Sequence, residues 1–433
     1  MNGTSSPGAN PPHDVSLGIA ANWPQFSLLM ATNAFVGGMA GLERAIVPIM
    51  GQKIFGLDSK FVILSFIATF GLSKAFANLA VGPLINRFSR KQLLISGWLV
   101  GIPVPFLLIW ADSWSVVLFA NLLLGLNQGL TWSMTVNMKI DMAGPKQRGL
   151  ALGLNETAGY LAVAASAFSA GLIADHYGLR PEPFYLGIGM ASAGLALSVL
   201  FIKDTERFVK TELALFPQSA LSNPVKKPGI ATKNLTAEKL AVTQAGFMNN
   251  FNDALVWGIV PLYLVTRNLT LEEIAAVAAM YPLVWGSLQT FTGWISDAVG
   301  RKPLIVVGMF IQGLAIISFS VVHSYGLFLT AACILGAGTA MVYPVLMAAI
   351  GDNSTPSSRS SALGRYRFWR DIGFTGGAIG AGIITDLFGF TAAINAVGAL
   401  TILSGWVAYW LMKDHAEIAA NRKIGAASTG ETL

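Results

Sequence analysis

The sequence predicts an all-α membrane protein with twelve transmembrane helices, arranged as two pseudo-symmetric bundles of six, with both termini in the cytoplasm. Of the 433 residues, 54% are hydrophobic and only 12% are charged, whereas a soluble domain carries about twice that charge. Apolar stretches of about 20 residues, enough to cross a hydrocarbon core of ~30 Å, recur along the whole chain. Inside lipid the backbone must satisfy its own hydrogen bonds, so each stretch is expected to be helical.

Short polar loops separate the expected spans, which cover residues 25–49, 62–84, 92–111, 115–138, 149–174, 184–202, 242–266, 274–296, 303–322, 326–350, 362–386 and 391–412. One long polar interval, 203–241, divides them six and six, and we interpret it as a cytoplasmic linker. The expected units are a cytoplasmic N-terminal tail, an N-terminal bundle, this linker, a C-terminal bundle and a cytoplasmic C-terminal tail. Their boundaries are 1–24, 25–202, 203–241, 242–412 and 413–433.

The distribution of positive charge sets the expected orientation. With the N-terminus in the cytoplasm, 19 of the 28 Lys and Arg residues fall in cytoplasmic segments and 4 in outer ones, in keeping with the positive-inside bias. The net charge of +6 then belongs to loops beside lipid. We therefore expect a lipid bilayer as the surroundings and no nucleic-acid partner.

A shift of 211 residues superimposes the two halves. The matched pairs are Gly82 and Gly293, Arg90 and Arg301, Lys91 and Lys302, Gly125 and Gly336, Asp141 and Asp352, Arg148 and Arg359, and Asp175 and Asp386. One constant offset from the second span to the fifth predicts a duplicated six-helix unit. Such repeats are typical of secondary transporters, whose site lies near the membrane midplane between the repeats.

Two loops carry a family pattern. GPLINRFSRK (82–91) follows the second span and GWISDAVGRK (293–302) follows the eighth. Both resemble the signature loop of the major facilitator superfamily, in which a glycine, an Asp-Arg pair and a basic cluster follow one another. The second copy keeps Asp297, whereas the first has Asn86 there and Ser89 in place of a glycine. The resemblance covers nearly the whole chain and implies a transporter that works by alternating access.

The same loops supply candidate gating residues. Asp297 is expected to cap a neighbouring helix or to pair with a basic residue, as a latch that breaks when the halves rock. Asn86 can hydrogen-bond without a charge, so the N-terminal latch is expected to be the weaker one. Arg90 and Arg301 complete the two loops, and a role as topology anchors is the alternative for the loop arginines.

Charges within spans are costly in lipid and predict functional residues. The carboxylates expected to carry protons are Asp253, Asp371 and Glu156. Asp253 is expected beside Arg370, either as a structural ion pair or as a proton site that senses substrate. Arg367 and Asp371 lie four residues apart on one helix face and are expected to be able to pair.

Three more charges lie in the N-terminal half. Lys74 has no carboxylate partner on its own span, which favours a functional role. Glu43 and Arg44 stand late in the first span, and we expect them near the outer surface as an outer-gate pair.

The family resemblance also implies which spans line a central cavity: the first, fourth, seventh and tenth, with the second, fifth, eighth and eleventh beside them. Helical spacing gathers polar and aromatic residues of these spans on common faces. The residues expected to bind substrate are Lys74, Asn78, Gln128, Trp132, Asn249, Asn250, Trp257, Gln289, Tyr343, Arg367 and Arg370. Packing or anchoring at the interface is the alternative for the aromatic members.

Mid-membrane cations and acids roughly balance, and acids that are paired or protonated leave cations free for a substrate. The sequence therefore favours a monomeric, proton-coupled transporter of a small anionic solute. An alternative is a proton-driven efflux antiporter for lipophilic or cationic compounds. Against it, span four reads GLNQG (125–129) without the arginine of that branch, and span five lacks its Gly-Pro signature. A transporter-like sensor or assembly factor that binds ligand without flux is the second alternative.

An enzyme is the weakest interpretation. The sequence contains no metal-ligand spacing, no nucleophile constellation and no phosphate loop, and the linker is too short for a soluble catalytic domain. We accordingly expect no cofactor and no metal. Compact loops favour a bacterial inner (cytoplasmic) membrane as the location.

Overall fold

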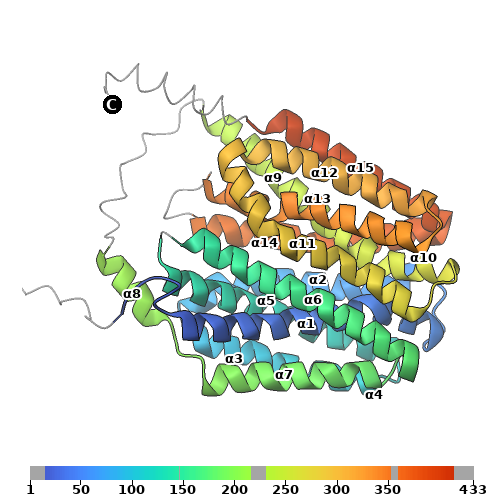
Figure 1. Cartoon of the computed structure of the whole chain (residues 1–433), viewed down its shortest axis with the longest axis horizontal. Coiled ribbons are helices and arrows are strands. Elements are labelled where there is room, and N and C mark those ends of the chain that lie inside the picture. Colours follow the sequence, from blue (N-terminus) through green and yellow to red (C-terminus); the bar gives the residue numbers. More distant parts are fainter. Residues whose placement is uncertain (1–14, 146, 216–230, 353–358, 414–433) are drawn as a thin grey trace, which may run out of the picture.

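The structure is a computed structural model that describes residues 15–145, 147–215, 231–352 and 359–413, and all regular secondary structure in these ranges is helical. Figure 1 shows two layers of roughly parallel helices, the blue-to-green N-terminal half below and the yellow-to-red C-terminal half above. Most of the two predicted tails and the middle of the predicted linker lie outside the described residues.

The N-terminal half contains α1 (Trp23–Lys53), α2 (Lys60–Ile85), α3 (Arg90–Gly101), α4 (Pro103–Trp110), α5 (Trp114–Ala143), α6 (Arg148–Tyr177) and α7 (Glu182–Leu200). The third predicted span is divided into α3 and α4 where Pro103 begins a new helix, since proline cannot donate the backbone hydrogen bond that would continue the old one. Ser59 caps α2 by accepting from the N–H of Val62, which fixes where that span begins.

The C-terminal half contains α9 (Ala231–Ala254), the π-helical turn η2 (Leu255–Ile259), α10 (Val260–Thr266), α11 (Leu271–Val299), α12 (Arg301–Val321), α13 (Tyr325–Asp352), α14 (Arg359–Phe388) and α15 (Phe390–Leu411). The seventh predicted span is thus α9, η2 and α10 in series. The π-turn begins two residues after Asp253, and such turns often mark functional positions.

The predicted linker is partly helical. α8 (Glu206–Leu215) lies within it, and α9 begins at Ala231, before the predicted seventh span. An ion pair between Arg148 and Glu212 ties α8 to the start of α6.

Both ends of the described chain lie at one end of the bundle. We call the end where α1 begins and α15 finishes the terminal face (left in Figure 1), and the opposite end, with the α1–α2 and α10–α11 loops, the distal face. Ten helices among the described residues are long and apolar enough to cross a membrane. The seventh and eleventh spans complete the twelve. They are more polar, because α9 carries asparagines and α14 opens with arginines.

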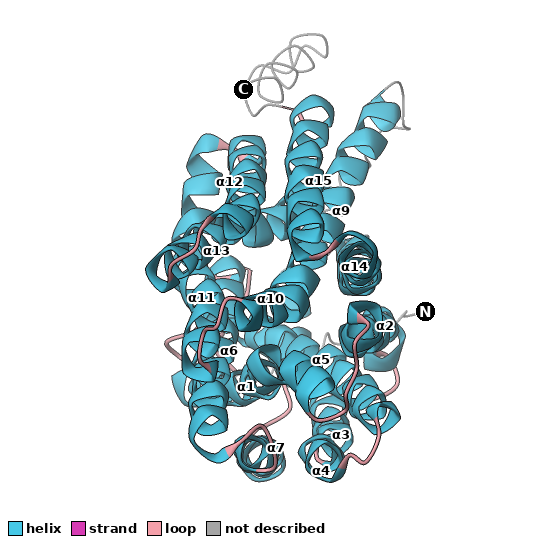
Figure 2. Cartoon of the chain, turned by 90° about the vertical axis from the view of Figure 1, so that its right-hand side faces the viewer, coloured by secondary structure: helices cyan, strands magenta, loops and turns pink. Residues whose placement is uncertain are grey.

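Two pairs of helices join the halves. α2 packs against α14, and α6 packs against α11, as the end-on view in Figure 2 shows. Small residues permit the close approach: a Cβ on Gly171 would lie 1.9 Å from the Cβ of Ala275, and one on Gly71 would lie 2.5 Å from the Cβ of Phe374. These contacts bring α2, α6 and α14 together around the centre of the bundle.

Candidate functional site

A small cavity lies where the two halves meet. Its volume is about 20 Å³, room for about one water molecule, so the structure holds the site in a contracted state. Helices α2, α5 and α6 supply one wall, and α13 and α14 supply the other. The lining residues are Lys74, Asn78, Gln128, Trp132, Ser133, Glu156, Tyr160, Tyr343, Met347, Arg367 and Arg370.

The C-terminal wall is built on a buried ion pair. Arg370 donates from Nε and Nη2 to Oδ1 of Asp371, at 2.9 and 2.8 Å, and from Nη1 to the hydroxyl of Tyr343 at 2.9 Å. Asp371 also accepts from Asn250 at 3.1 Å and from Asn78 at 2.5 Å. Multiple partners offset the cost of burying the two charges. Both groups are therefore held in place before any substrate arrives.

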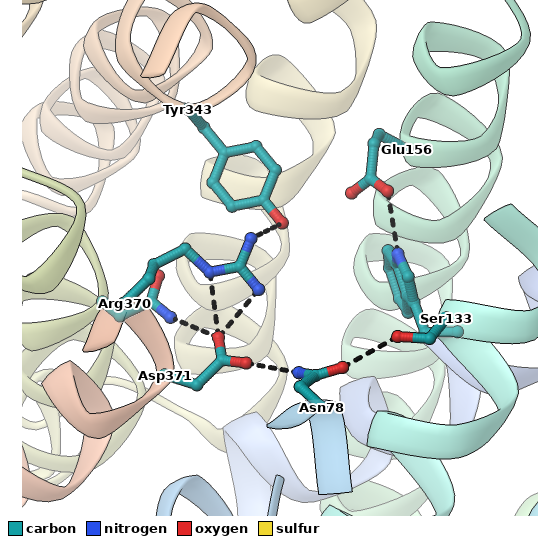
Figure 3. A network of polar contacts seen from close by, with 8 residues as sticks. Asn78, Ser133, Glu156, Tyr343, Arg370 and Asp371 are labelled. Carbon is teal, nitrogen blue, oxygen red and sulfur yellow. Dashed lines mark hydrogen bonds and ion pairs between the residues drawn. The ribbon is translucent and has the colours of Figure 1, made fainter. Parts of the chain in front are cut away.

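Asn78 connects the two walls, as Figure 3 shows. Its Nδ2 donates to Asp371, and its Oδ1 accepts from Ser133 at 2.8 Å. Because Asn78 belongs to α2 and Asp371 to α14, this chain of hydrogen bonds crosses between the halves. Separation of the walls must break it.

Glu156 is the acid that lines the cavity. Its Oε1 accepts from the indole N–H of Trp132 at 2.8 Å and from Asn155 at 3.1 Å. Its Oε2 is buried and has no hydrogen-bond partner among the described residues. One oxygen of this carboxyl group is therefore available to a proton or a ligand.

Two cations of the lining have no carboxylate partner within the described residues: Lys74 and Arg367. The ammonium of Lys74 instead lies over three rings, 5.3 Å from the centroid of Phe70, 5.8 Å from Trp132 and 5.5 Å from Phe374. Aromatic faces attract a cation but do not neutralise it. The cavity thus keeps two positive charges that the surrounding protein does not pair.

Aromatic rings close the cavity on its distal side. On α2, α6 and α14 a ring lies one turn nearer the distal face than the charged residue: Phe70 before Lys74, Tyr160 after Glu156, and Phe374 after Arg370. Rings of both halves are in contact, with centroids 3.6 Å apart for Tyr160 and Trp285, 4.9 Å for Trp285 and Tyr343, 5.8 Å for Trp257 and Phe374, and 5.6 Å for Phe70 and Phe374. We call these six residues the aromatic layer: Phe70, Tyr160, Trp257, Trp285, Tyr343 and Phe374.

A second group of buried charges lies near the aromatic layer: Arg44, Asp253 and Glu43. The guanidinium of Arg44 lies between the rings of Phe70 and Trp257, 4.6 and 4.5 Å from their centroids. Asp253 accepts a hydrogen bond from Tyr281 at 2.5 Å through Oδ1, and its Oδ2 has no partner in the described structure. Both oxygens of Glu43 are also buried without a hydrogen-bond partner there.

The expected position of Glu43 and Arg44 near the outer surface is wrong. Each side chain is only 1% exposed, and α1 continues to Lys53, about 14 Å beyond at 1.5 Å per residue. The sequence estimate ended the first span at residue 49 and took late position for surface exposure, whereas the packed bundle encloses this part of α1.

Two expected ion pairs are also wrong. Asp253 pairs with Tyr281 rather than with Arg370, and Asp371 pairs with Arg370 rather than with Arg367. Arg370 and Asp371 are neighbours whose side chains meet directly, so the guanidinium fork takes the adjacent carboxylate. Helical spacing of four residues predicted the pair of Arg367 and Asp371, because spacing alone does not consider contacts between adjacent side chains.

Seven of the eleven residues expected to bind substrate line the cavity: Lys74, Asn78, Gln128, Trp132, Tyr343, Arg367 and Arg370. Asn249, Asn250, Trp257 and Gln289 do not. Asn249 accepts from Gln312 of α12 at 3.3 Å, and so it faces away from the cavity. Gln289 is buried with neither amide atom hydrogen-bonded in the described structure. The polar face predicted for α9 was too wide, because residues 249 and 250 point in different directions.

Three lining residues were missed by the sequence analysis: Ser133, Tyr160 and Met347. Tyr160 and Met347 each follow a predicted site residue by four positions, Glu156 and Tyr343. One helical turn places such pairs on the same face. That spacing was the available signal.

The two signature loops carry matching ion pairs at the terminal face. Arg90 pairs with Asp141 at 2.5 Å, and Arg301 pairs with Asp352 at 2.9 Å. The same separation of 51 residues in both pairs reflects the repeat. Asp297 takes the pairing alternative, with Arg301 at 2.6 Å. Asn86 ends α2 through its backbone, and its side chain makes no hydrogen bond within the described residues.

Two carboxylates join the halves at the distal face. Asp386, at the end of α14, accepts from Ser59 Oγ at 2.6 Å and from the backbone N–H groups of Lys60 and Phe61 at 2.6 and 3.0 Å. These N–H groups begin α2. In the other half, Asp175 at the end of α6 accepts from the N–H of Leu271, the first residue of α11, at 3.1 Å.

The two distal contacts are related by the repeat, since adding 211 takes Asp175 to Asp386 and Lys60 to Leu271. A carboxylate at a helix N-terminus is stabilised by unpaired N–H groups and by the helix dipole. We call these two contacts the distal caps. The repeat had matched the two aspartates, but only the structure shows what they contact.

The sequence profile of the Major Facilitator Superfamily matches residues 21–236 and 242–430. The chain belongs to the Major Facilitator Superfamily. The twelve spans in two repeated halves and the paired signature loops agree with this family, whose members are transporters rather than enzymes. The chain is therefore a multi-pass membrane transporter.

Proteins similar in sequence to this chain include the "Multidrug resistance protein MdtG" of Salmonella choleraesuis. It is 25% identical over 404 residues, which cover 91% of this chain and 96% of that protein. The protein of the same name from Salmonella newport has the same identity and coverage. Among solved structures, a POT family transporter in complex with 5-aminolevulinic acid has a TM-score of 0.73, at 13% identity, covering 90% of this chain and 96% of that one. The human organic anion transporter MFSD10 has a TM-score of 0.65, at 11% identity, covering 89% and 99%.

Within the described residues, no group of three or more His, Cys, Asp or Glu side chains could hold a metal ion. The cavity can contact rings through Trp132 and Tyr160, attract negative charge through Lys74 and Arg367, and hydrogen-bond a ligand at the unpaired oxygen of Glu156.

Proposed function

We propose that this chain is a secondary transporter that exports small lipophilic compounds in exchange for protons. The observation that carries the proposal is the central cavity, in which charged and aromatic side chains of both halves meet. Relatives named multidrug resistance proteins over 91% of the chain support export over the uptake of a nutrient. The proposed location is a bacterial inner membrane, where the chain works as a monomer.

In this proposal the halves rock about the cavity. The compound enters from the terminal face, the aromatic layer and the distal caps separate, and the compound leaves at the distal face. The chain of hydrogen bonds through Asn78 breaks and re-forms in each cycle. The distal pair Glu43 and Arg44 then acts inside the bundle, as part of the barrier that opens.

Buried carboxylates supply the proton sites. Glu156 has an unpaired oxygen in the cavity, and Asp253 has one near the aromatic layer. A buried carboxylate oxygen without a hydrogen-bond partner is costly, and in this proposal a proton occupies it during part of the cycle. Asp371 is the least suited of the three, because its oxygens already accept from Arg370, Asn78 and Asn250.

The test is reconstitution of the full chain in proteoliposomes with an imposed pH gradient. The expected result is movement of an aromatic lipophilic probe against its gradient, lost in Glu156→Gln and Asp253→Asn. The matched control is Asp112→Asn, an exposed acid of the α4–α5 loop that contacts only its neighbour Ser113 in the described structure. Probe movement that ignores the pH gradient would contradict proton coupling, and binding without movement would favour the sensor alternative.

A second candidate is proton-coupled uptake of a small anionic solute. The observation that favours it is the pair of cations, Lys74 and Arg367, which line the cavity without a carboxylate partner among the described residues. The direction of movement separates the two candidates. In the same proteoliposomes, uptake would be driven by symport with protons and export by exchange against them.

A further inference from the structure

The unpaired cations of the cavity bear on which compounds are exported. We infer that the site selects amphiphilic organic anions, compounds with an aromatic body and one carboxylate or similar acidic group. The direction of transport, export, is taken from the proposed function. The evidence for the selectivity is the cavity alone.

Charges in the lining are unequal once the pairs are removed. Arg370 is neutralised by Asp371 through two hydrogen bonds. Lys74, Arg367 and Glu156 remain, two cations and one acid. The unpaired groups of the lining thus carry a net positive charge, which repels a cationic compound, whereas an anion supplies the missing counter-charge.

The geometry divides the cavity between charge and rings. Lys74 projects from α2 in the N-terminal half and Arg367 from α14 in the C-terminal half, so an acidic group between them would contact both halves. Trp132 and Tyr160 lie beside these cations, with ring centroids 5.4 Å apart, and offer a face for an aromatic body. Because the contracted cavity has room for about one water molecule, the walls must move apart to admit a compound that bridges the halves in this way.

The test compares three probes of nearly equal shape on the purified full chain: a naphthalene carboxylate, its neutral carboxamide and a naphthylmethyl ammonium ion. Calorimetric titration should give the carboxylate at least about tenfold tighter binding than either of the others, as expected for a charge-assisted hydrogen bond. Lys74→Gln and Arg367→Gln should each weaken carboxylate binding about tenfold or more and leave carboxamide binding nearly unchanged.

Two control variants distinguish the loss of a charge in the cavity from a general structural effect of substitution. Lys74→Arg keeps the charge and should retain most carboxylate binding. Arg87→Gln removes an exposed arginine of the first signature loop that does not line the cavity. It should leave carboxylate binding unchanged.

Tighter binding of the ammonium probe, equal binding of all three, or no carboxylate binding at millimolar concentration would each overturn the inference. So would carboxylate binding that survives both glutamine substitutions. Failure of the proposed function looks different: the carboxylate would bind with the expected charge dependence, yet no pH gradient would move it across proteoliposomes. That result would support the selectivity for anions and contradict the proposed export.

Discussion

The two ends of the bundle fasten their helices differently. At the distal face the contacts cross from one half to the other: Asp386 of the C-terminal half caps α2, and Asp175 of the N-terminal half caps α11. At the terminal face the ion pairs of the signature loops stay inside one half. The clearest cases are Arg90 with Asp141 and the corresponding pair of the repeat.

The terminal face also has a capping carboxylate that remains within its own half. Asp204 accepts from the N–H of Lys91, at the start of α3, at 3.0 Å, and from the N–H of Glu206, at the start of α8, at 2.9 Å. The same chemistry thus performs two tasks. A cap within one half preserves the shape of that half, whereas a cap between halves must break when the distal face opens. Changes at the two faces should therefore alter different quantities.

The largest effect is expected from Arg90→Met at the terminal face. It leaves Asp141, which is only 9% exposed, without its cation, and should lower the free energy of unfolding by roughly 2–3 kcal/mol. The thermal unfolding midpoint of the purified protein measures this. The same change at Arg87, an exposed arginine of the same loop, should have little effect. A large shift in the balance between open and closed distal faces would contradict this separation of tasks between the two faces.

Asp386→Ala should have the largest effect at the distal face. It removes three hydrogen bonds between the halves, and its exposed position keeps the cost at roughly 1–2 kcal/mol, a five- to thirty-fold shift toward the distal-open state. Spin labels at Asp58 and Glu272, one in each half, would report longer distances, after replacement of the single cysteine, Cys333. Asp112→Ala is the matched control.

Asp175→Ala should act in the same direction but more weakly, by roughly 0.5–1 kcal/mol, because it loses a single hydrogen bond of 3.1 Å. The same pair of spin labels measures it. Since the two caps do not touch, their effects should add in the double variant. An effect larger than that of Asp386→Ala would refute the idea that the number of cross-half hydrogen bonds sets the balance.

The smallest effect is expected from Asp204→Ala, roughly 0.5 kcal/mol of stability, as for a partly exposed cap. Burial raises the pKa of Asp204, but hydrogen bonds from the N–H groups of Lys91 and Glu206 lower it by more. The pKa of Asp204 is therefore below its ordinary value. The contribution is thus present at neutral pH and fades as the pH falls through this lowered pKa. Thermal unfolding of wild type and variant should converge in acid; a constant difference would count against the cap.

Much of the candidate site could be predicted from sequence. Lys74, Trp132 and Arg367 were found because charge within a span is rare and helical spacing gives its face. What spacing could not give was the partner. Arg370 bonds to its own neighbour Asp371, and Asn249 turns toward α12. Such choices depend on which helices pack together, and a single helix does not contain that information.

The aromatic layer and the distal caps show the same limit. Phe70, Phe374 and Trp257 look like ordinary apolar residues in their spans, and their contacts form only when α2, α14 and η2 meet. Asp175 and Asp386 were matched by the repeat, yet nothing local reveals that each reaches the start of a helix in the other half.

The sequence alone determined the class of protein, the twelve spans and the repeat. Each span must match the thickness and polarity of the bilayer by itself, and its length and polarity are local properties of the sequence. The tertiary structure decided which charges are paired, which remain open to a substrate and which contacts cross between the halves. The physical reason is that a buried charge takes its partner from whatever packs against it, and in this chain that partner often lies hundreds of residues away.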